Sequence, residues 1–409
     1  MTTYWLRLAY AVIFFLLSPF FSVRAASDVD IKPGDIIGPH NWERVQGMIG
    51  ENLLNRIKQG YTFKIKQPRM IQPLKEYLEA TEKYSSHVRL GPKGELLNYV
   101  AGLPFPNFDP NDPQAGLKLA WNFYWRWLGD DYKNGGAIRG GEGKIVRYVI
   151  ERDGSERRAD VINLHIRTRN RVTLDPKPAI PGYEHIDWMQ IRADEYPRDT
   201  SGTTTLEIRY VDPKREEDLY IYVPSIRRVR RAPPIQRCET LAPSEFNFDD
   251  INSFNGKITD FNYKFVGEKK MLGNFSQEQL PFRRRKGDYL PMDESWEVID
   301  SYLLEITPKD PTYCYPKKIL YIDRTHFEAF WTMIWDAKGN YWKEQFGFRT
   351  PVKLSDGREV LSIGTVVIIN VQNGRSSLVT VSRVYNYGFQ PSLFTLATLQ
   401  QVMRGGSIR

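Results

Sequence analysis

The chain has 409 residues, of which 41% are hydrophobic and 13% aromatic, and its formal net charge at pH 7 is +8. This length exceeds the usual size of a single hydrophobic core, so the sequence is compatible with one very large sheet-based unit or with two coupled domains. The 57 basic residues stand against 49 acidic ones. Such a balance predicts only weak attraction to acidic partners and gives no reason to expect nucleic-acid binding.

The N-terminus has the pattern of an export signal. A single charge, Arg7, precedes an apolar run over residues 8–21, and Val23-Arg24-Ala25 follows with small residues where a signal peptidase needs them. We predict a signal peptide over residues 1–25 that is cleaved near Ala25. The alternative is a retained membrane anchor, because the apolar run is nearly long enough for one. No cysteine stands directly after the run, which argues against a lipid anchor.

The rest of the chain is expected to be a periplasmic, water-soluble protein. No later stretch approaches the ~18 consecutive apolar residues that a membrane-spanning helix needs. Removal of the leader takes away Arg7 and Arg24 and no acidic residue, so the net charge falls from +8 to +6.

Residues 26–143 predict an N-terminal region of helices and irregular links. The stretch from 38 to 60 favours one helix capped by Asn41, because apolar residues recur every three or four positions and Gly60 ends it. Residues 101–113 hold four prolines and should form an extended link. A second helix is expected after Pro113. It is aromatic on more than one face, through Trp121, Phe123, Tyr124, Trp125 and Trp127.

Residues 144–409 change to a period of two, which is typical of strands. The first hairpin should turn at Asp153-Gly154, and a later one at Asn373-Gly374. Along the first hairpin apolar residues alternate with polar ones, and a later run repeats this with Leu206, Ile208 and Tyr210 on the apolar face. We predict an α+β, mainly β fold with one large curved antiparallel sheet. A few helices should cover the sheet, and a short helix should end the chain.

No catalytic motif stands out. The glycine-rich stretch 135–144 does not match a phosphate-binding loop, because Ile138 and Ile145 occupy positions that need glycine and serine or threonine. The serine-hydrolase and zinc-protease motifs are missing, and the five histidines are scattered. A pair of distant carboxylates for glycoside hydrolysis remains open. We therefore expect a protein that is not an enzyme and that needs no metal or cofactor.

Two cysteines, Cys238 and Cys314, are expected to form one disulfide in an oxidising compartment; the alternative is two buried free thiols. Their separation of 76 residues would make the bridge worth roughly 4 kcal/mol in the chain-entropy model.

Four arginines within five positions follow an aromatic strand: Arg227, Arg228, Arg230 and Arg231. Strand alternation would place arginine on both faces, unlike a nucleic-acid patch. Three interpretations remain. The arginines form internal salt bridges with Asp249 and Asp250, or they bind an anionic headgroup or partner, or they are solvated surface.

Seven blocks of sequence carry a family resemblance: "NWERVQGMIGENLLNRIKQGYTFKI", "GLPFP", "WNFYWRWLGD", "YVPSIRRVRR", "FDDINSFNGK", "KKMLG" and "KKILYID". In this order they resemble the bacterial domain-of-unknown-function family 1329 over nearly the whole mature chain. That family resembles in turn the periplasmic lipoprotein carrier and the outer-membrane lipoprotein receptor. The resemblance implies an unclosed antiparallel barrel with helices over its mouth and an apolar cavity within. It assigns no catalytic residue.

The leading hypothesis is a monomeric periplasmic carrier or chaperone that binds a lipid or another hydrophobic molecule. A membrane exporter or outer-membrane protein would be its partner. The alternatives are an accessory subunit of an export complex that carries no ligand, and an exported hydrolase of polysaccharide or lipid. The aromatic helix could also fill a solid core and leave no cavity. The expected apolar lining is Trp121, Phe123, Tyr124, Trp125, Trp127, Leu206, Ile208 and Tyr210.

Overall fold

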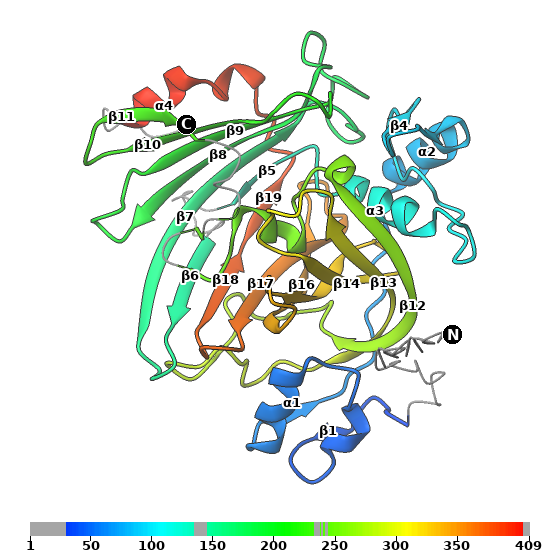
Figure 1. Ribbon diagram of the computed structural model, residues 1–409, viewed down its shortest axis with the longest axis vertical. Coiled ribbons are helices and arrows are strands. Elements are labelled where there is room, and N and C mark those ends of the chain that lie inside the picture. The colour runs from blue at the N-terminus through cyan, green and yellow to red at the C-terminus, as the bar shows by residue number, and fades with distance from the viewer. Residues whose placement is uncertain (1–29, 135–144, 233–237, 239, 242–243, 404–409) are drawn as a thin grey trace, which may run out of the picture. The chain divides into compact units, whose positions relative to one another are not determined.

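One antiparallel sheet dominates the chain after residue 130 (Figure 1). The computed structural model describes residues 30–134, 145–232, 238, 240–241 and 244–403. Among these residues, those from Ile31 onward form one compact unit. The predicted signal peptide and the glycine-rich stretch 135–144 lie outside the described residues.

Within the described residues the sheet has 15 strands, in the order β11-β10-β9-β8-β7-β6-β18-β17-β16-β15-β14-β13-β12, with β5 paired to β7 and β19. The strands are β5 (Asp131–Asn134), β6 (Ile145–Ile150), β7 (Glu156–Arg167), β8 (Ile186–Tyr196), β9 (Thr204–Tyr210), β10 (Asp218–Val223), β11 (Arg228–Arg231), β12 (Phe261–Gly273), β13 (Glu297–Pro308), β14 (Lys317–Asp323), β15 (Ala329–Trp335), β16 (Tyr341–Lys353), β17 (Glu359–Asn370), β18 (Ser376–Val381) and β19 (Arg383–Tyr385). In these described parts the order runs from β11 to β12 without returning, so the sheet is not closed into a barrel. The predicted fold class is confirmed.

Both predicted hairpins form. In the first, β6 pairs with β7, and Ile150 and Glu156 form the pair next to the turn. Gly154 lies in this turn and has a φ of +82°. β17 and β18 pair from Ile369 with Ser376 around Gly374, whose φ is +77°. The positive φ at each turn explains why glycine is needed there.

The sheet has two faces that can be followed through its register, because directly paired residues point to the same side. One row runs from Leu320 through Thr332 and Gln345 to Ile368. We call this side the inner face. The opposite side, which carries Trp331 and Phe346, is the outer face.

The N-terminal segment covers the outer face with an aromatic core. The Phe63 and Trp296 rings lie 5.4 Å apart, and Trp331 lies 5.1 Å from Phe346. The elements in this segment are β1 (Ile36–Ile37), a 3-10 helix (Trp42–Val45), α1 (Glu51–Lys58) and β2 (Phe63–Lys64).

The predicted single helix over 38–60 is therefore wrong. Gly47 has φ of +83° and breaks it into the 3-10 turn and α1. Asn41 stands at the N-cap position of the 3-10 turn, but its side chain makes no capping bond there. Its Oδ1 accepts from Gly38 N at 2.8 Å and its Nδ2 donates to Ile36 O at 2.9 Å. At position 50, a Cβ would lie 2.2 Å from the Glu344 carboxyl carbon, so a larger residue there would displace this buried carboxyl.

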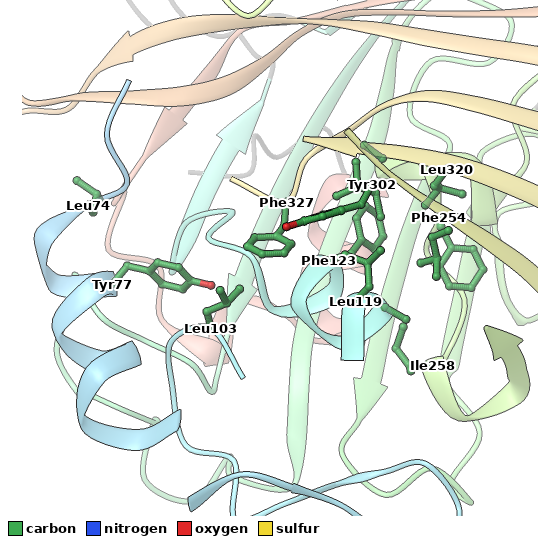
Figure 2. Packing of buried hydrophobic residues seen from close by; sticks show 14 of the residues in the cluster. Leu74, Tyr77, Leu103, Leu119, Phe123, Phe254, Ile258, Tyr302, Leu320 and Phe327 are labelled. Atoms are coloured by element: carbon green, nitrogen blue, oxygen red, sulfur yellow. The ribbon is translucent and has the colours of Figure 1, made fainter. Parts of the chain in front are cut away.

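The aromatic helix α3 (Ala115–Trp125) covers the inner face at β12 and β13. Gly116 allows the close approach, since a Cβ there would lie 2.6 Å from the Tyr263 carbonyl oxygen. Figure 2 shows Leu119 and Phe123 of α3 in one buried cluster with Phe254, Tyr302 and Leu320. This end of the inner face is a filled apolar core.

The remaining elements complete the N-terminal region and the chain end. They are α2 (Lys75–Tyr84), β3 (Arg89–Leu90), β4 (Leu96–Leu97), α4 (Leu396–Met403) and 3-10 turns at Ser85–His87, Phe248–Ser253, Ile258–Asp260 and Pro391–Leu393. Among the described residues, no helix combines the length and the hydropathy that crossing a membrane requires.

Candidate functional site: a cavity on the inner face

A cavity of about 130 Å³ lies on the inner face where β5 to β8 meet β16 to β19. Its walls are partly apolar and partly polar. The apolar lining is Ile145, Val161, Leu241, Phe246, Ile251, Ile363, Val366, Val379 and Val381. The polar lining is Tyr132, Asn134, Arg147, Asn163, Gln190, Arg192, Asp250, Asn252, Ser253, Gln345, Arg349 and Arg383.

Residues 244–254, which we call the covering segment, lie across this part of the inner face. Phe246 packs in a buried cluster with Ile334, Val366 and Ile368 of the sheet. Without this segment the apolar residues of β15 and β17 would be exposed to water, so its burial stabilises the sheet.

Polar contacts hold the covering segment in place. Lys318 Nζ donates to Asp250 Oδ1 at 2.7 Å, and Tyr315 donates to Asp250 Oδ2 at 2.8 Å. Lys343 Nζ donates to the Glu245 carbonyl at 2.7 Å. Burial lowers the pKa of Lys343 and raises the pKa of Tyr315 well above its ordinary value. Buried charges of this kind are stable only because they are paired and hydrogen-bonded.

A shared carboxylate organises two of the nearby arginines. Glu328 Oε1 lies 3.0 Å from Arg126 Nε, and its Oε2 lies 3.1 Å from Arg349 Nη2. Burial acts to raise the pKa of Glu328, but Arg126 and Arg349 lower it by more. The carboxylate therefore stays ionised and links the end of α3 to β16.

Two amide oxygens in the cavity wall are buried without a hydrogen-bond donor among the described residues. They are Oδ1 of Asn163 and Oε1 of Gln345. Buried polar atoms are nearly always paired, so each calls for a water or a ligand group.

The residues predicted as an apolar lining are divided among several places. Trp121, Tyr124, Trp125 and Tyr210 border a second cavity of about 100 Å³, which also includes Asp187 and Arg209. Trp127 borders a third, of about 120 Å³, and stacks on Tyr385. Phe123 is part of the filled core beneath α3.

Leu206 and Ile208 do not face the inner side. β8 and β9 pair Met189 with Ile208 and Ile191 with Leu206, on the outer face. There they pack in a cluster with Phe394 and Leu399 near the chain end. The predicted alternation of apolar and polar residues on β9 is present, but the prediction that its apolar residues face the cavity is wrong. α4 covers the apolar, outer face of these strands, and their polar residues lie on the inner face.

The predicted salt bridges of the arginine cluster with Asp249 and Asp250 are wrong. The chain turns after Val223, and Arg228 to Arg231 form β11 at the end of the sheet, where all four arginines of the cluster are exposed. Arg231 pairs with Asp218 on the neighbouring strand at 2.6 Å. Asp249 and Asp250 instead accept from Tyr313 and Tyr315 beneath the covering segment. The headgroup and solvated-surface interpretations remain predictions.

Cys238 and Cys314 are joined in a disulfide, with Cα atoms 5.7 Å apart. The bridge ties the chain before the covering segment to the turn before β14. No group of three or more potential metal ligands occurs among the residues described.

The cavity arginines Arg147, Arg192, Arg349 and Arg383 were missed by sequence reasoning. Each is a single polar residue within a strand and looks like one position of a solvated face. One signal could have indicated them. These arginines alternate with apolar residues on the opposite face of the same strands, and that opposite face is itself covered by other parts of the chain.

The comparisons with known proteins give a family and a fold. The family model described as a protein of unknown function (DUF1329) matches residues 36–400. The chain belongs to this family. The resemblance seen in the sequence is thus confirmed. A comparison with curated protein sequences gave no match.

Two solved structures share the fold. A candidate outer-membrane lipoprotein-sorting protein domain from Vibrio parahaemolyticus is 17% identical, with a TM-score of 0.51 over 70% of this chain and 99% of the other. A DUF1329 family protein from Desulfovibrio piger gives the same identity and TM-score over 70% and 98%. At this identity the likeness concerns the fold alone.

Proposed function

We propose that the protein is an exported carrier that binds a hydrophobic or amphipathic molecule in the inner-face cavity. The observation that carries the proposal is the cavity of about 130 Å³ beneath the covering segment. The signal-like N-terminus and the fold shared with a candidate lipoprotein-sorting domain support export and a carrier role. Catalysis has no support from a motif in the sequence.

The size of the cavity limits what it accepts without rearrangement. A cavity of about 150 Å³ in an unrelated protein takes up benzene, so this one fits a ring or a short chain. A long acyl chain gains about 0.8 kcal/mol for each methylene that leaves water. It would need the covering segment to move off the sheet, which breaks the contacts of Asp250 with Lys318 and of Glu245 with Lys343.

The proposal is tested on full-length protein that is exported by its host and purified without detergent. Native mass spectrometry should show a bound small molecule, and an environment-sensitive apolar dye should bind and be displaced by short-chain amphiphiles. The variant Val379→Phe fills the cavity from β18 and should weaken dye binding by about tenfold or more. Val229→Phe, at a half-buried position on β11, is the matched control and should bind as the wild type does.

Protein that is consistently empty, takes up no dye and is indifferent to Val379→Phe would contradict the proposal. It would favour the accessory subunit that carries nothing, and co-purification with an exporter or outer-membrane protein would then be the informative assay.

A further inference from the structure

The charged lining of the inner-face cavity is mostly basic. Arg147 comes from β6, Arg192 from β8, Arg349 from β16 and Arg383 from β19, and Asp250 is the acidic residue in the wall. Strands that are far apart in the sequence thus bring guanidinium groups to one small volume.

The nearby acids are already engaged. Asp250 accepts from Lys318 and Tyr315. Glu328 is shared between Arg126 and Arg349, so one carboxylate serves two guanidinium groups. Asp250 is thus engaged by Lys318, and Glu328, which also favours the charged form of Arg383, is shared among several guanidinium groups.

Arg192 and Arg383 lack a hydrogen-bonded carboxylate in the part of the chain that the structure describes. Asp194 Oδ1 lies 3.7 Å from Arg192 Nη2, which is beyond hydrogen-bond distance. Arg383 Nε donates to the neutral amide oxygen of Asn134 at 3.0 Å, and its guanidinium lies 3.7 Å from the centre of the Tyr132 ring. Arg383 is only 6% exposed.

The carboxylates that lie near these arginines are therefore shared or too distant for a hydrogen bond. Asp194 lies 3.7 Å from Arg192, and Glu328 is divided between Arg126 and Arg349. His165, whose ring stacks 4.6 Å from that of Tyr132, is also affected by these positive charges. Burial first, and then Arg167 and Arg383, hold its pKa well below the ordinary value.

A buried guanidinium group is stabilised when an anion pairs with it, and an anion that enters the cavity can do this for Arg192 and Arg383. Carboxylate and phosphate groups match the fork of guanidinium donors. The valine side chains of β17 and β18 offer an apolar wall beside the arginines. We propose that the cavity binds the anionic headgroup, a carboxylate or phosphate, of an amphipathic ligand, with Arg192 and Arg383 as its ion-pairing residues. This inference rests on the proposed carrier function and names the class of ligand.

Titration calorimetry on the full-length, detergent-free protein tests it with octanoate, octyl phosphate, octanol and inorganic phosphate. Octanoate and octyl phosphate should bind about tenfold or more tightly than octanol and than inorganic phosphate. Arg192→Met and Arg383→Met should remove that preference and leave octanol affinity within about twofold. Arg89→Met, which removes an exposed arginine from β3, is the matched control and should change neither affinity.

A second measurement does not depend on the variants folding. Raising the salt concentration should weaken octanoate binding to the wild type and leave octanol binding nearly unchanged, because the ion pair is screened and the apolar contact is not. Equal binding of octanol and octanoate would refute the proposed anionic headgroup, but it would not contradict the proposed carrier function. Binding of none of the amphiphiles would overturn both. Inorganic phosphate that binds as tightly as octyl phosphate would refute the amphipathic ligand and leave a plain anion site.

Discussion

Replacement of Glu344 by glutamine should make the protein more stable at neutral and alkaline pH. Glu344 lies on the outer face of β16 and is fully buried. One carboxylate oxygen accepts from Asn52 N at the start of α1, at 3.1 Å, and from the Tyr341 hydroxyl at 3.0 Å. These donors favour the ionised form, but burial opposes it more strongly and raises the pKa to about 7.

The sign and size of the expected change in stability follow from the linkage between proton binding and folding. In the unfolded chain Glu344 ionises near its ordinary pKa of 4.5, and in the folded protein near 7. Between these values the folded state holds a proton that the unfolded state has lost, so stability falls as pH rises and levels off above the folded pKa. A shift of this size corresponds to about 3 kcal/mol. Glutamine resembles the protonated acid and does not titrate.

The assay is urea unfolding of the wild type and of Glu344→Gln at several values between about pH 5 and about pH 8. The stability of the variant relative to the wild type should increase by up to about 3 kcal/mol over this range. Glu82→Gln, an exposed change on α2, removes the same charge and should give a difference that hardly varies with pH. If the difference for Glu344→Gln is also independent of pH, the buried carboxyl is not the titrating group.

Two further changes test the packing around the inner face. Glu328→Gln leaves Arg126 and Arg349 without their shared carboxylate and should lower the free energy of unfolding, measured in urea, by about 3–5 kcal/mol. The control is Glu359→Gln, which removes the half-buried partner of exposed Arg69 and should cost under about 1 kcal/mol. Equal losses would contradict the role of the shared acid. Leu119→Ala removes a fully buried side chain from the cluster in Figure 2 and should lower the free energy of unfolding by about 2–5 kcal/mol. Leu78→Ala, at a site 49% exposed, is the control and should cost about 0.5 kcal/mol or less. A similarly small loss at Leu119 would show that α3 is loosely packed.

Local sequence signals predicted much of the fold. The turns at Gly154 and Gly374 and the alternation of Ile162, Leu164 and Ile166 with polar residues are properties of neighbouring positions, so hairpins and strand faces could be read directly. The break at Gly47 was missed because apolar residues continue in helical spacing across it, whereas the backbone of Gly47 adopts a φ of +83° that no apolar pattern reveals.

The candidate site could not be predicted in the same way, because distant segments decide which face of a strand is inside. β6 pairs with β18 through Ile150 and Ser376, residues more than 200 positions apart. The apolar face that carries Leu206 was expected to line a cavity, yet α4 covers it. The arginine cluster at Arg227 to Arg231 drew attention through its density, whereas the arginines that meet in the cavity are single residues on four strands.

The position of the cavity also bears on the kind of molecule that the proposed carrier would bind. At β12 to β14 the inner face is apolar and α3 fills it with Leu119 and Phe123. At β7 and β8 the same face carries polar residues such as Asn163 and Arg192. The cavity lies where these two environments meet. A purely apolar ligand would leave the arginines without an anion, and a purely ionic one would leave the valines in contact with water or charge. An amphipathic ligand satisfies both walls at once.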